Sequence, residues 1–330
     1  MTEFTSKLKK FVVVGGAGFI GGHFIDYLLS KDRTERVRVF DNFSSGREWH
    51  ISHHESDPRF DVVRGDVVDL EALTNALEGY DTVIHLASNP DIAAAATNPL
   101  IDFEQGTLLT QNVVEAMRRA GVGQILYASG SGVYGDLGEV EGKENYGPMI
   151  PVSTYGASKL AGEALISSYC YMFGLIGCAF RFGNVVGARQ THGVGFDFVR
   201  RLLKDSSQLE ILGDGKQSKS YIHVSDVINA VMTAAEKAPL PFTAFNVATG
   251  DYISVTEIAE LAVEAVESSL SETKLHYTGG DRGWKGDVPI VRINTDLIRS
   301  LGWSNVYNTR DALKASIDAM LIDFKSGKLS

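Results

Sequence analysis

A short apolar segment followed by three regularly spaced glycines constrains the fold of this chain more than any other feature. Residues 11–14, Phe-Val-Val-Val, have the composition of a buried β-strand. Gly15, Gly18 and Gly21 follow at intervals of three residues, and the apolar residues after them recur at helical spacing. The chain therefore turns from strand to helix within the glycine run, where backbone N–H groups at the helix N-terminus can approach a pyrophosphate.

A second strand supports the interpretation of the glycine motif as a dinucleotide site and argues against a glycine-rich surface turn. Residues 37–40 form another apolar segment, and Asp41 follows it, twenty residues after Gly21. An acidic side chain at this distance can accept hydrogen bonds from ribose hydroxyls. A carboxylate repels a 2′-phosphate, so Asp41 favours NAD over NADP. Arg47 is the opposing feature, because its guanidinium could bind that phosphate.

A tyrosine and a lysine four residues apart predict the chemistry. Ser153 or Thr154 can cap a helix, and Tyr155 and Lys159 then lie on one face of it. A free phenol has a pKa of about 10. The nearby ammonium and a positively charged nicotinamide both favour the phenolate, and Lys159 can also hold the nicotinamide ribose. The alternative is an exposed tyrosine beside a lysine that pairs with Glu163.

Strand and helix patterns alternate through the first half of the chain. Strands are predicted at 11–14, 37–40, 60–63, 82–86, 124–128 and 175–181. Helices are predicted at 19–29, 69–78, 104–120 and 155–172, and later at 192–204, 255–269 and 309–324. This order predicts an α/β fold, a Rossmann-type doubly wound parallel sheet with a smaller C-terminal substrate lobe. We assign residues 1–180, with 222–251 returning, to the NAD-binding domain, and residues 181–221 and 252–330 to the substrate lobe.

Motifs along nearly the whole chain resemble one known family. The chain resembles the extended short-chain dehydrogenase/reductases, in the nucleotide-sugar epimerase/dehydratase group, and is most similar to UDP-glucose 4-epimerases. Besides the two motifs above, the resemblance rests on residues 65–67, 85–88, 105–107, 127–135, 181–187, 213–215, 221–224 and 282–287.

The resemblance implies a set of site residues. Those expected to bind NAD are Gly15, Gly18, Phe19, Ile20, Asp41, Asn42, Ser44, Ser45, Gly46, Asp66, Val67, Leu86, Ala87, Ser88, Gln105, Tyr155 and Lys159. Those expected to bind a nucleotide sugar, with UDP as the nucleotide, are Asn184, Val194, Lys219 and Arg282. No metal is expected.

The chain departs from the family pattern beside the catalytic tyrosine. Members usually carry Ser or Thr where this chain has Gly130, so Ser129 or Ser131 would have to supply that hydroxyl. A shift of one strand position moves a side chain to the other face. Dehydratases and decarboxylases carry acidic residues at the positions of Ser131 and Gly132, so both activities are disfavoured. Lys219 also stands where members of the family often have an arginine. The lysine ammonium is a point charge, whereas a planar guanidinium can donate two parallel hydrogen bonds to a phosphate.

Composition narrows the remaining possibilities. A net charge of −10 argues against binding to nucleic acid or anionic membranes. The sequence has no 18-residue apolar run and no signal peptide, so we expect a cytoplasmic protein. We separately expect a homodimer. Cys170 and Cys178 lie in an apolar stretch and are expected to pack in the core.

Several other residues invite assignments that we do not favour. The histidines at positions 50, 53 and 54 lie in a polar loop without the spacing of metal ligands. His192 follows the segment expected to bind phosphate, and a surface loop is favoured there over a substrate contact. Met117 and Met172 are expected in the core.

The two motifs and the family resemblance together predict an NAD-dependent nucleotide-sugar 4-epimerase, and the resemblance alone implies that the nucleotide sugar is a UDP-hexose. Tyr155 would take a proton from the C4 hydroxyl, and the 4-keto sugar would turn over before its reduction on the other face. One alternative is a nucleotide-sugar dehydratase or keto-sugar reductase. Another is a non-catalytic binding protein that retains NAD.

Overall fold

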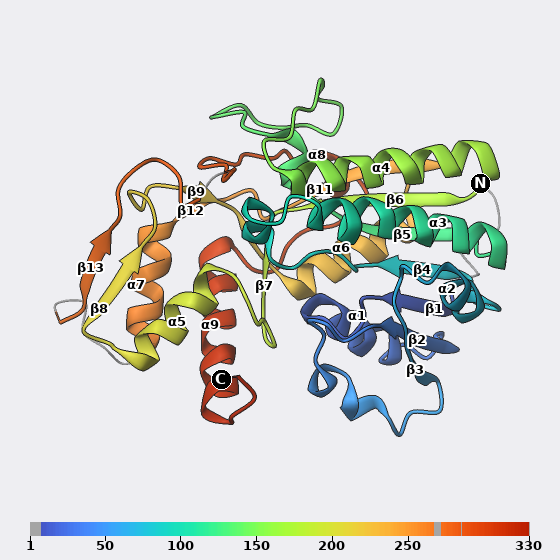
Figure 1. Ribbon diagram of the computed structural model, residues 1–330, viewed down its shortest axis with the longest axis horizontal. Helices are drawn as coiled ribbons and strands as arrows, with labels where there is room; N and C mark the ends of the chain where they lie inside the picture. Colours follow the sequence, from blue (N-terminus) through green and yellow to red (C-terminus); the bar gives the residue numbers. More distant parts are fainter. Residues whose placement is uncertain (1–7, 267–271, 285, 330) are drawn as a thin grey trace.

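A parallel sheet of seven strands forms the centre of the molecule (Figure 1). The computed structural model describes residues 8–266, 272–284 and 286–329. The strand order is β11-β6-β5-β4-β1-β2-β3, and every neighbouring pair is parallel. The strands are β1 (Lys10–Val14), β2 (Arg36–Asp41), β3 (Phe60–Arg64), β4 (Thr82–His85), β5 (Gln124–Gly130), β6 (Ile176–Phe182) and β11 (Phe242–Val247). The predicted Rossmann-type fold is confirmed.

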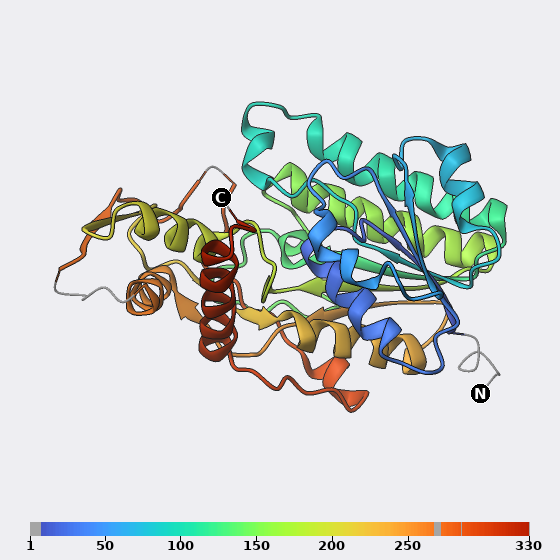
Figure 2. The ribbon, with the colours of Figure 1, turned by 90° about the horizontal axis from the view of Figure 1, so that it is seen from below.

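Helices cover both faces of the sheet. Figure 2 shows α1 and α6 on one face and α2, α3 and α4 on the other. Their bounds are α1 (Phe19–Leu29), α2 (Leu70–Leu77), α3 (Leu109–Ala120), α4 (Thr154–Phe173) and α6 (Val224–Lys237). Alternation along β1 explains the two layers, because Phe11 and Val13 pack in the core beneath α1 and α6, while Val12 and Val14 pack in the opposite core.

Most of the remaining elements form a smaller lobe with its own core. Its helices are α5 (Val194–Lys204), α7 (Val255–Ala265) and α9 (Thr309–Lys325). Helix α8 (Asp296–Ser300) instead contacts β11, and its Ile298 packs in the core beneath α1 and α6. The short strands of the lobe are β7 (Asn184–Val186), β8 (Gln208–Ile211), β9 (Ser218–Lys219), β10 (Tyr221–His223), β12 (Ile253–Ser254) and β13 (Lys274–Tyr277). Short helical turns within the described residues are η2 (Glu48–His50), η3 (Ser52–His54), η4 (Ile92–Ala96), η5 (Phe103–Leu108) and η6 (Ser131–Tyr134).

The structure alters some predicted boundaries. The helix expected at 104–120 is broken at Gln105, whose φ and ψ are −95° and 16°, so a π-helical turn precedes α3. The helix expected from residue 192 begins at Val194, because Gly193 has φ +99°. The helix expected at 255–269 ends at Ala265, and residues 267–269 lie outside the described part of the chain. Helix α6 and strand β11 were not predicted as individual elements.

Sulfur-containing residues test the predicted core. Cys170 and Cys178 are buried and unbonded, and Met117 is fully buried, as expected. The prediction for Met172 is wrong, because this side chain is 72% exposed. It lies two residues after the buried Cys170, which places it about 200° around α4 on the opposite face. No helix in the described ranges has both the length and the apolar character needed to cross a bilayer.

Candidate active site

A cavity of about 860 Å³ lies at the carboxyl ends of the strands, between the sheet and the smaller lobe. Its wall includes Gly15 after β1, Asp41 at the end of β2, Leu86 after β4, Ser131 after β5 and Asn184 after β6. Strand order reverses between β1 and β4, and ligands of doubly wound folds bind in the crevice at such a point.

The glycine turn forms a close-fitting cradle. Gly15 has φ +81°, and a Cβ atom there would lie 2.7 Å from the backbone nitrogen of Ala87. Gly18 is the N-cap of α1, so the first N–H groups of this helix face the turn. A Cβ atom on Gly21 would lie 2.6 Å from the Cα atom of Gly16. The helix can therefore approach the turn this closely only because residue 21 is a glycine. The cradle fits a pyrophosphate group.

Asp41 is held where a ribose would bind. Its Oδ2 atom accepts a hydrogen bond from the Ala17 N–H at 2.9 Å, and Oδ1 accepts one from the Phe43 N–H at 2.8 Å. Burial raises the pKa of this carboxyl group. A Cβ atom on Gly46 would lie 3.0 Å from Oδ1, so the following loop closes over the carboxylate. Arg47 is exposed and does not line the cavity, so its placement does not support a 2′-phosphate site.

The other residues expected to bind the cofactor surround the same cavity. They come from α1, from the loops after β2, β3 and β4, and from η5. They are Phe19, Ile20, Asn42, Ser44, Ser45, Asp66, Val67, Leu86, Ala87, Ser88 and Gln105.

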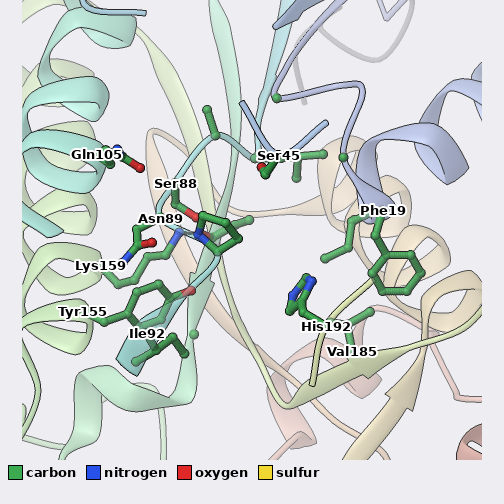
Figure 3. A pocket seen from close by; sticks show the side chains of 18 of the residues that line it. Phe19, Ser45, Ser88, Asn89, Ile92, Gln105, Tyr155, Lys159, Val185 and His192 are labelled. Atoms are coloured by element: carbon green, nitrogen blue, oxygen red, sulfur yellow. Dashed lines mark hydrogen bonds between the residues drawn. The ribbon is translucent and has the colours of Figure 1, made fainter. Parts of the chain in front are cut away.

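Helix α4 carries Tyr155 and Lys159 into the cavity wall (Figure 3). Ser153 caps the helix by accepting the Gly156 N–H at 3.1 Å. The Nζ atom of Lys159 is 5.4 Å from the centre of the Tyr155 ring and donates a 2.9 Å hydrogen bond to the Ala128 carbonyl. Lys159 is buried and does not pair with a carboxylate four residues later, so the alternative of a surface ion pair is wrong.

Burial sets the ionisation of both groups. It raises the pKa of Tyr155 to about 12; the charge of Asp102 adds to this rise, and the Ser88 hydroxyl opposes it. Burial also lowers the pKa of Lys159 to about 8, against the influence of Asp102. Without the positive charge of the cofactor, burial dominates the pKa of the phenol, and the lowering expected from ammonium and nicotinamide together stays a prediction.

The two serines beside Gly130 have different surroundings. Ser129 Oγ donates a 2.6 Å hydrogen bond to Glu163, a buried carboxylate that also pairs with Arg181 at 2.7 Å. Both serines line the cavity, and Ser131 begins η6. Because Glu163 already accepts the hydrogen bond of the Ser129 hydroxyl, this geometry favours Ser131 over Ser129 as the hydroxyl beside the substrate.

Gly130 has ordinary extended backbone angles, φ −156° and ψ 161°. A Cβ atom there would meet nothing within 4 Å. An extended backbone suits any residue, so a serine would fit at this position without backbone strain.

Three of the four residues expected to bind substrate line the cavity: Asn184, Val194 and Lys219. Lys219 is already paired, with its Nζ atom 2.5 Å from Asp287 Oδ1. Arg282 is the exception, because it does not line the cavity. Its guanidinium donates to Asp136 Oδ2 and to the Asp287 carbonyl, both at 2.7 Å.

The structure adds cavity residues that the sequence analysis missed. Trp284, from the same segment as Arg282, lines the cavity, and so does Asn89 after β4. The sequence signal that could have indicated Trp284 is an aromatic residue in a short segment bounded by Gly283 and Gly286. His192 is exposed, as a loop residue would be, but it also lines the cavity on the side opposite Tyr155 (Figure 3).

The nearby histidine loop differs from its predicted character. His50 is buried rather than polar and exposed, and its Nδ1 atom lies 2.8 Å from the Ala17 carbonyl of the glycine turn. His53 and His54 both contact Asp26, at 2.9 and 2.7 Å. Arg189 pairs with the same carboxylate, so a guanidinium already balances its charge.

Comparisons with known proteins agree with this geometry. The model of the NAD dependent epimerase/dehydratase family matches residues 11–248. A UDP-glucose 4-epimerase from Mycolicibacterium smegmatis is 31% identical over 300 residues, covering 88% of this chain and 92% of the relative. UDP-glucuronic acid decarboxylase 1 from Arabidopsis thaliana is 31% identical over 328 residues, covering 97% and 71%. A crystal structure of a UDP-galactose 4-epimerase has a TM-score of 0.84 at 32% identity, covering 95% and 99%.

Proposed function

The chain belongs to the NAD-dependent epimerase/dehydratase family, whose cofactor is NAD, and we propose that it is a 4-epimerase acting on a UDP-hexose. One observation carries this proposal. Tyr155 and Lys159 face the cavity beside the cofactor cradle, while Ser131 and Gly132 stand where an elimination would need a carboxylate. The site thus has a group for moving a proton at an alcohol and no further base at those positions.

The residues divide the work of the reaction. NAD, when bound, supplies reversible hydride transfer at C4 of the sugar. Tyr155 takes the proton from the C4 hydroxyl and returns it after the sugar has presented its other face. Lys159, fixed by the Ala128 carbonyl, holds a positive charge next to the phenol and can bind the nicotinamide ribose. Asp41 holds the adenosine ribose, and its carboxylate repels a 2′-phosphate.

The smaller lobe is proposed to hold the nucleotide. Residues 181–221 and 252–330 supply Asn184, Val194 and Lys219 to the cavity. Val194 is the first residue of α5, a helix of eleven residues, so free N–H groups at its N-terminus can bind a diphosphate. The UDP-sugar names of the relatives support the choice of nucleotide.

Two alternatives remain in view. The relatives include UDP-glucuronic acid decarboxylases and a dTDP-glucose 4,6-dehydratase. Those activities are disfavoured by Ser131 and Gly132, which cannot act as a carboxylate base. A non-catalytic NAD-binding protein is disfavoured by the shared placement of Tyr155 and Lys159 in the cavity wall.

Turnover of UDP-hexoses tests the proposal. The purified protein is incubated with UDP-glucose or UDP-galactose without added nucleotide, and products are followed by NMR. We expect interconversion of the two sugars. The Tyr155→Phe variant should keep its NAD but lose about 10²–10⁴-fold in kcat, the scale of a lost acid–base group. Activity of this variant within threefold of the parent would remove Tyr155 from the mechanism.

A further inference from the structure

Arg189 connects the segment after β7 to the cofactor side of the molecule. Its Nη1 atom donates to the His50 carbonyl at 2.8 Å, and Nη2 donates to His23 Nδ1 at 2.9 Å. The same guanidinium pairs with Asp26, one turn along α1 from His23. Arg189 also has φ +66°, a backbone conformation that costs a non-glycine residue energy and that the surrounding contacts must maintain.

His23 strengthens this connection. A guanidinium can only donate, so Nδ1 of His23 accepts and its ring proton lies on Nε2. Nε2 then donates to the Ala188 carbonyl at 2.8 Å. Burial, together with the charge of Arg189, lowers the pKa of His23 to about 4, so the ring is neutral near pH 7. Helix α1 therefore contacts two consecutive residues of the segment after β7, Ala188 and Arg189.

The other side of the segment is held by α9. Ser316 Oγ accepts the Gly187 N–H at 3.0 Å and lies 3.1 Å from Gln190 Oε1. Gln190 Nε2 in turn donates to the His192 carbonyl at 2.8 Å. These contacts end at His192, whose ring lies in the cavity near Phe19 and across from Tyr155 (Figure 3).

We propose that Arg189 is a positioning residue for substrate binding, which holds residues 187–193 against α1 so that His192 contacts the nucleotide sugar. The identity of the ligand rests on the function proposed above. A neutral imidazole can donate one hydrogen bond and accept another, so His192 suits a sugar hydroxyl or a phosphate oxygen. A structural ion pair alone would stabilise the fold without affecting the affinity for the sugar.

Kinetics of single and double variants separate these roles. In the NAD-loaded enzyme, Arg189→Ala and His192→Ala should each raise KM for the UDP-hexose about tenfold and leave kcat within threefold. The double variant should have the KM of His192→Ala alone, because Arg189 acts through His192. Arg189→Lys should have a KM between those of the parent and Arg189→Ala, because an ammonium keeps the positive charge but lacks the planar pair of donor nitrogens. Arg33→Ala is the matched control, because Arg33 pairs with Glu236 on α6 and does not line the cavity.

Hydrogen exchange provides a readout that does not depend on turnover. Backbone amides in peptides spanning residues 187–194 should exchange faster in Arg189→Ala than in the parent or in Arg33→Ala. Unchanged exchange would overturn the positioning role, and so would KM effects that multiply in the double variant. If the parent turns over no UDP-hexose, the proposed function fails, and the exchange experiment still decides whether Arg189 holds the segment.

Discussion

The hydroxyl group of Ser129 donates a hydrogen bond to the carboxylate of Glu163 across 2.6 Å, between β5 and α4. The preceding residue, Ala128, accepts the hydrogen bond from Lys159 through its carbonyl. Two successive residues of β5 thus fasten the helix that carries the catalytic pair. Ser129 has a positioning role in this arrangement, and Ser131 remains as the hydroxyl beside the substrate.

The two serines should therefore respond differently to substitution. Ser131→Ala should lower kcat tenfold or more, which corresponds to the loss of about 1.4 kcal/mol of transition-state stabilisation. Ser129→Ala should instead lower the free energy of unfolding by about 1–3 kcal/mol, because a buried carboxylate loses a donor. Steady-state kinetics and urea denaturation measure both effects. Ser168→Ala, on the exposed side of α4, is the control. Parent-like kcat in Ser131→Ala would leave water or a substrate hydroxyl in its place.

Gly130→Ser should be tolerated. The backbone is extended and a Cβ atom would meet nothing within 4 Å, so the free energy of unfolding should change by less than about 0.5 kcal/mol. We expect kcat within threefold of the parent, because Ser131 already supplies a hydroxyl. A tenfold gain in kcat would show that the native site lacks this group.

Lys159 should make the free energy of unfolding depend on pH in the alkaline range. Its pKa falls from 10.5 to about 8 in the folded chain because burial penalises the ammonium. The unfolded chain then binds more protons between these values, so the free energy of unfolding rises with pH from about 8 to 10.5. In nucleotide-free protein, the parent should gain stability relative to Lys159→Met over this window. A constant difference between the two would contradict the buried ammonium.

The cofactor released on denaturation should be NAD. Asp41 lies in the cavity wall and repels a 2′-phosphate, whereas Arg47 does not line the cavity. Chromatography of the nucleotide from denatured protein decides between the two cofactors. Arg47→Ala should leave the released nucleotide unchanged, while a dominant NADP peak from the parent would show that the arginine outweighs the aspartate.

The sequence predicts well where local pattern and backbone chemistry coincide. The glycine turn and α1 are confirmed with the predicted bounds, because strand, glycine spacing and helix periodicity all indicate the same geometry. Long-range pairing was less predictable. Glu163 lies four residues after Lys159, but it pairs with Arg181 from β6, and no local spacing shows that partner.

The smaller lobe was harder to predict for the same reason. Arg282 carries the charge expected of a phosphate ligand, but Asp136, far away in sequence, binds it instead. Trp284 takes a place in the cavity wall that a charge-based reading does not suggest. Strand β11 joins the sheet beside β6 through a short segment whose pattern alone does not reveal its neighbour.

The most direct test of the proposed epimerase uses UDP-glucose labelled with deuterium at C4. The enzyme is incubated with this substrate without added nucleotide, and the C4 position of the products is followed by NMR. We predict UDP-galactose that retains deuterium at C4, because the label removed from one face is returned to the other within the same cavity. A 4-keto-6-deoxy product, loss of the label to solvent, or no conversion of any UDP-hexose would contradict the proposal.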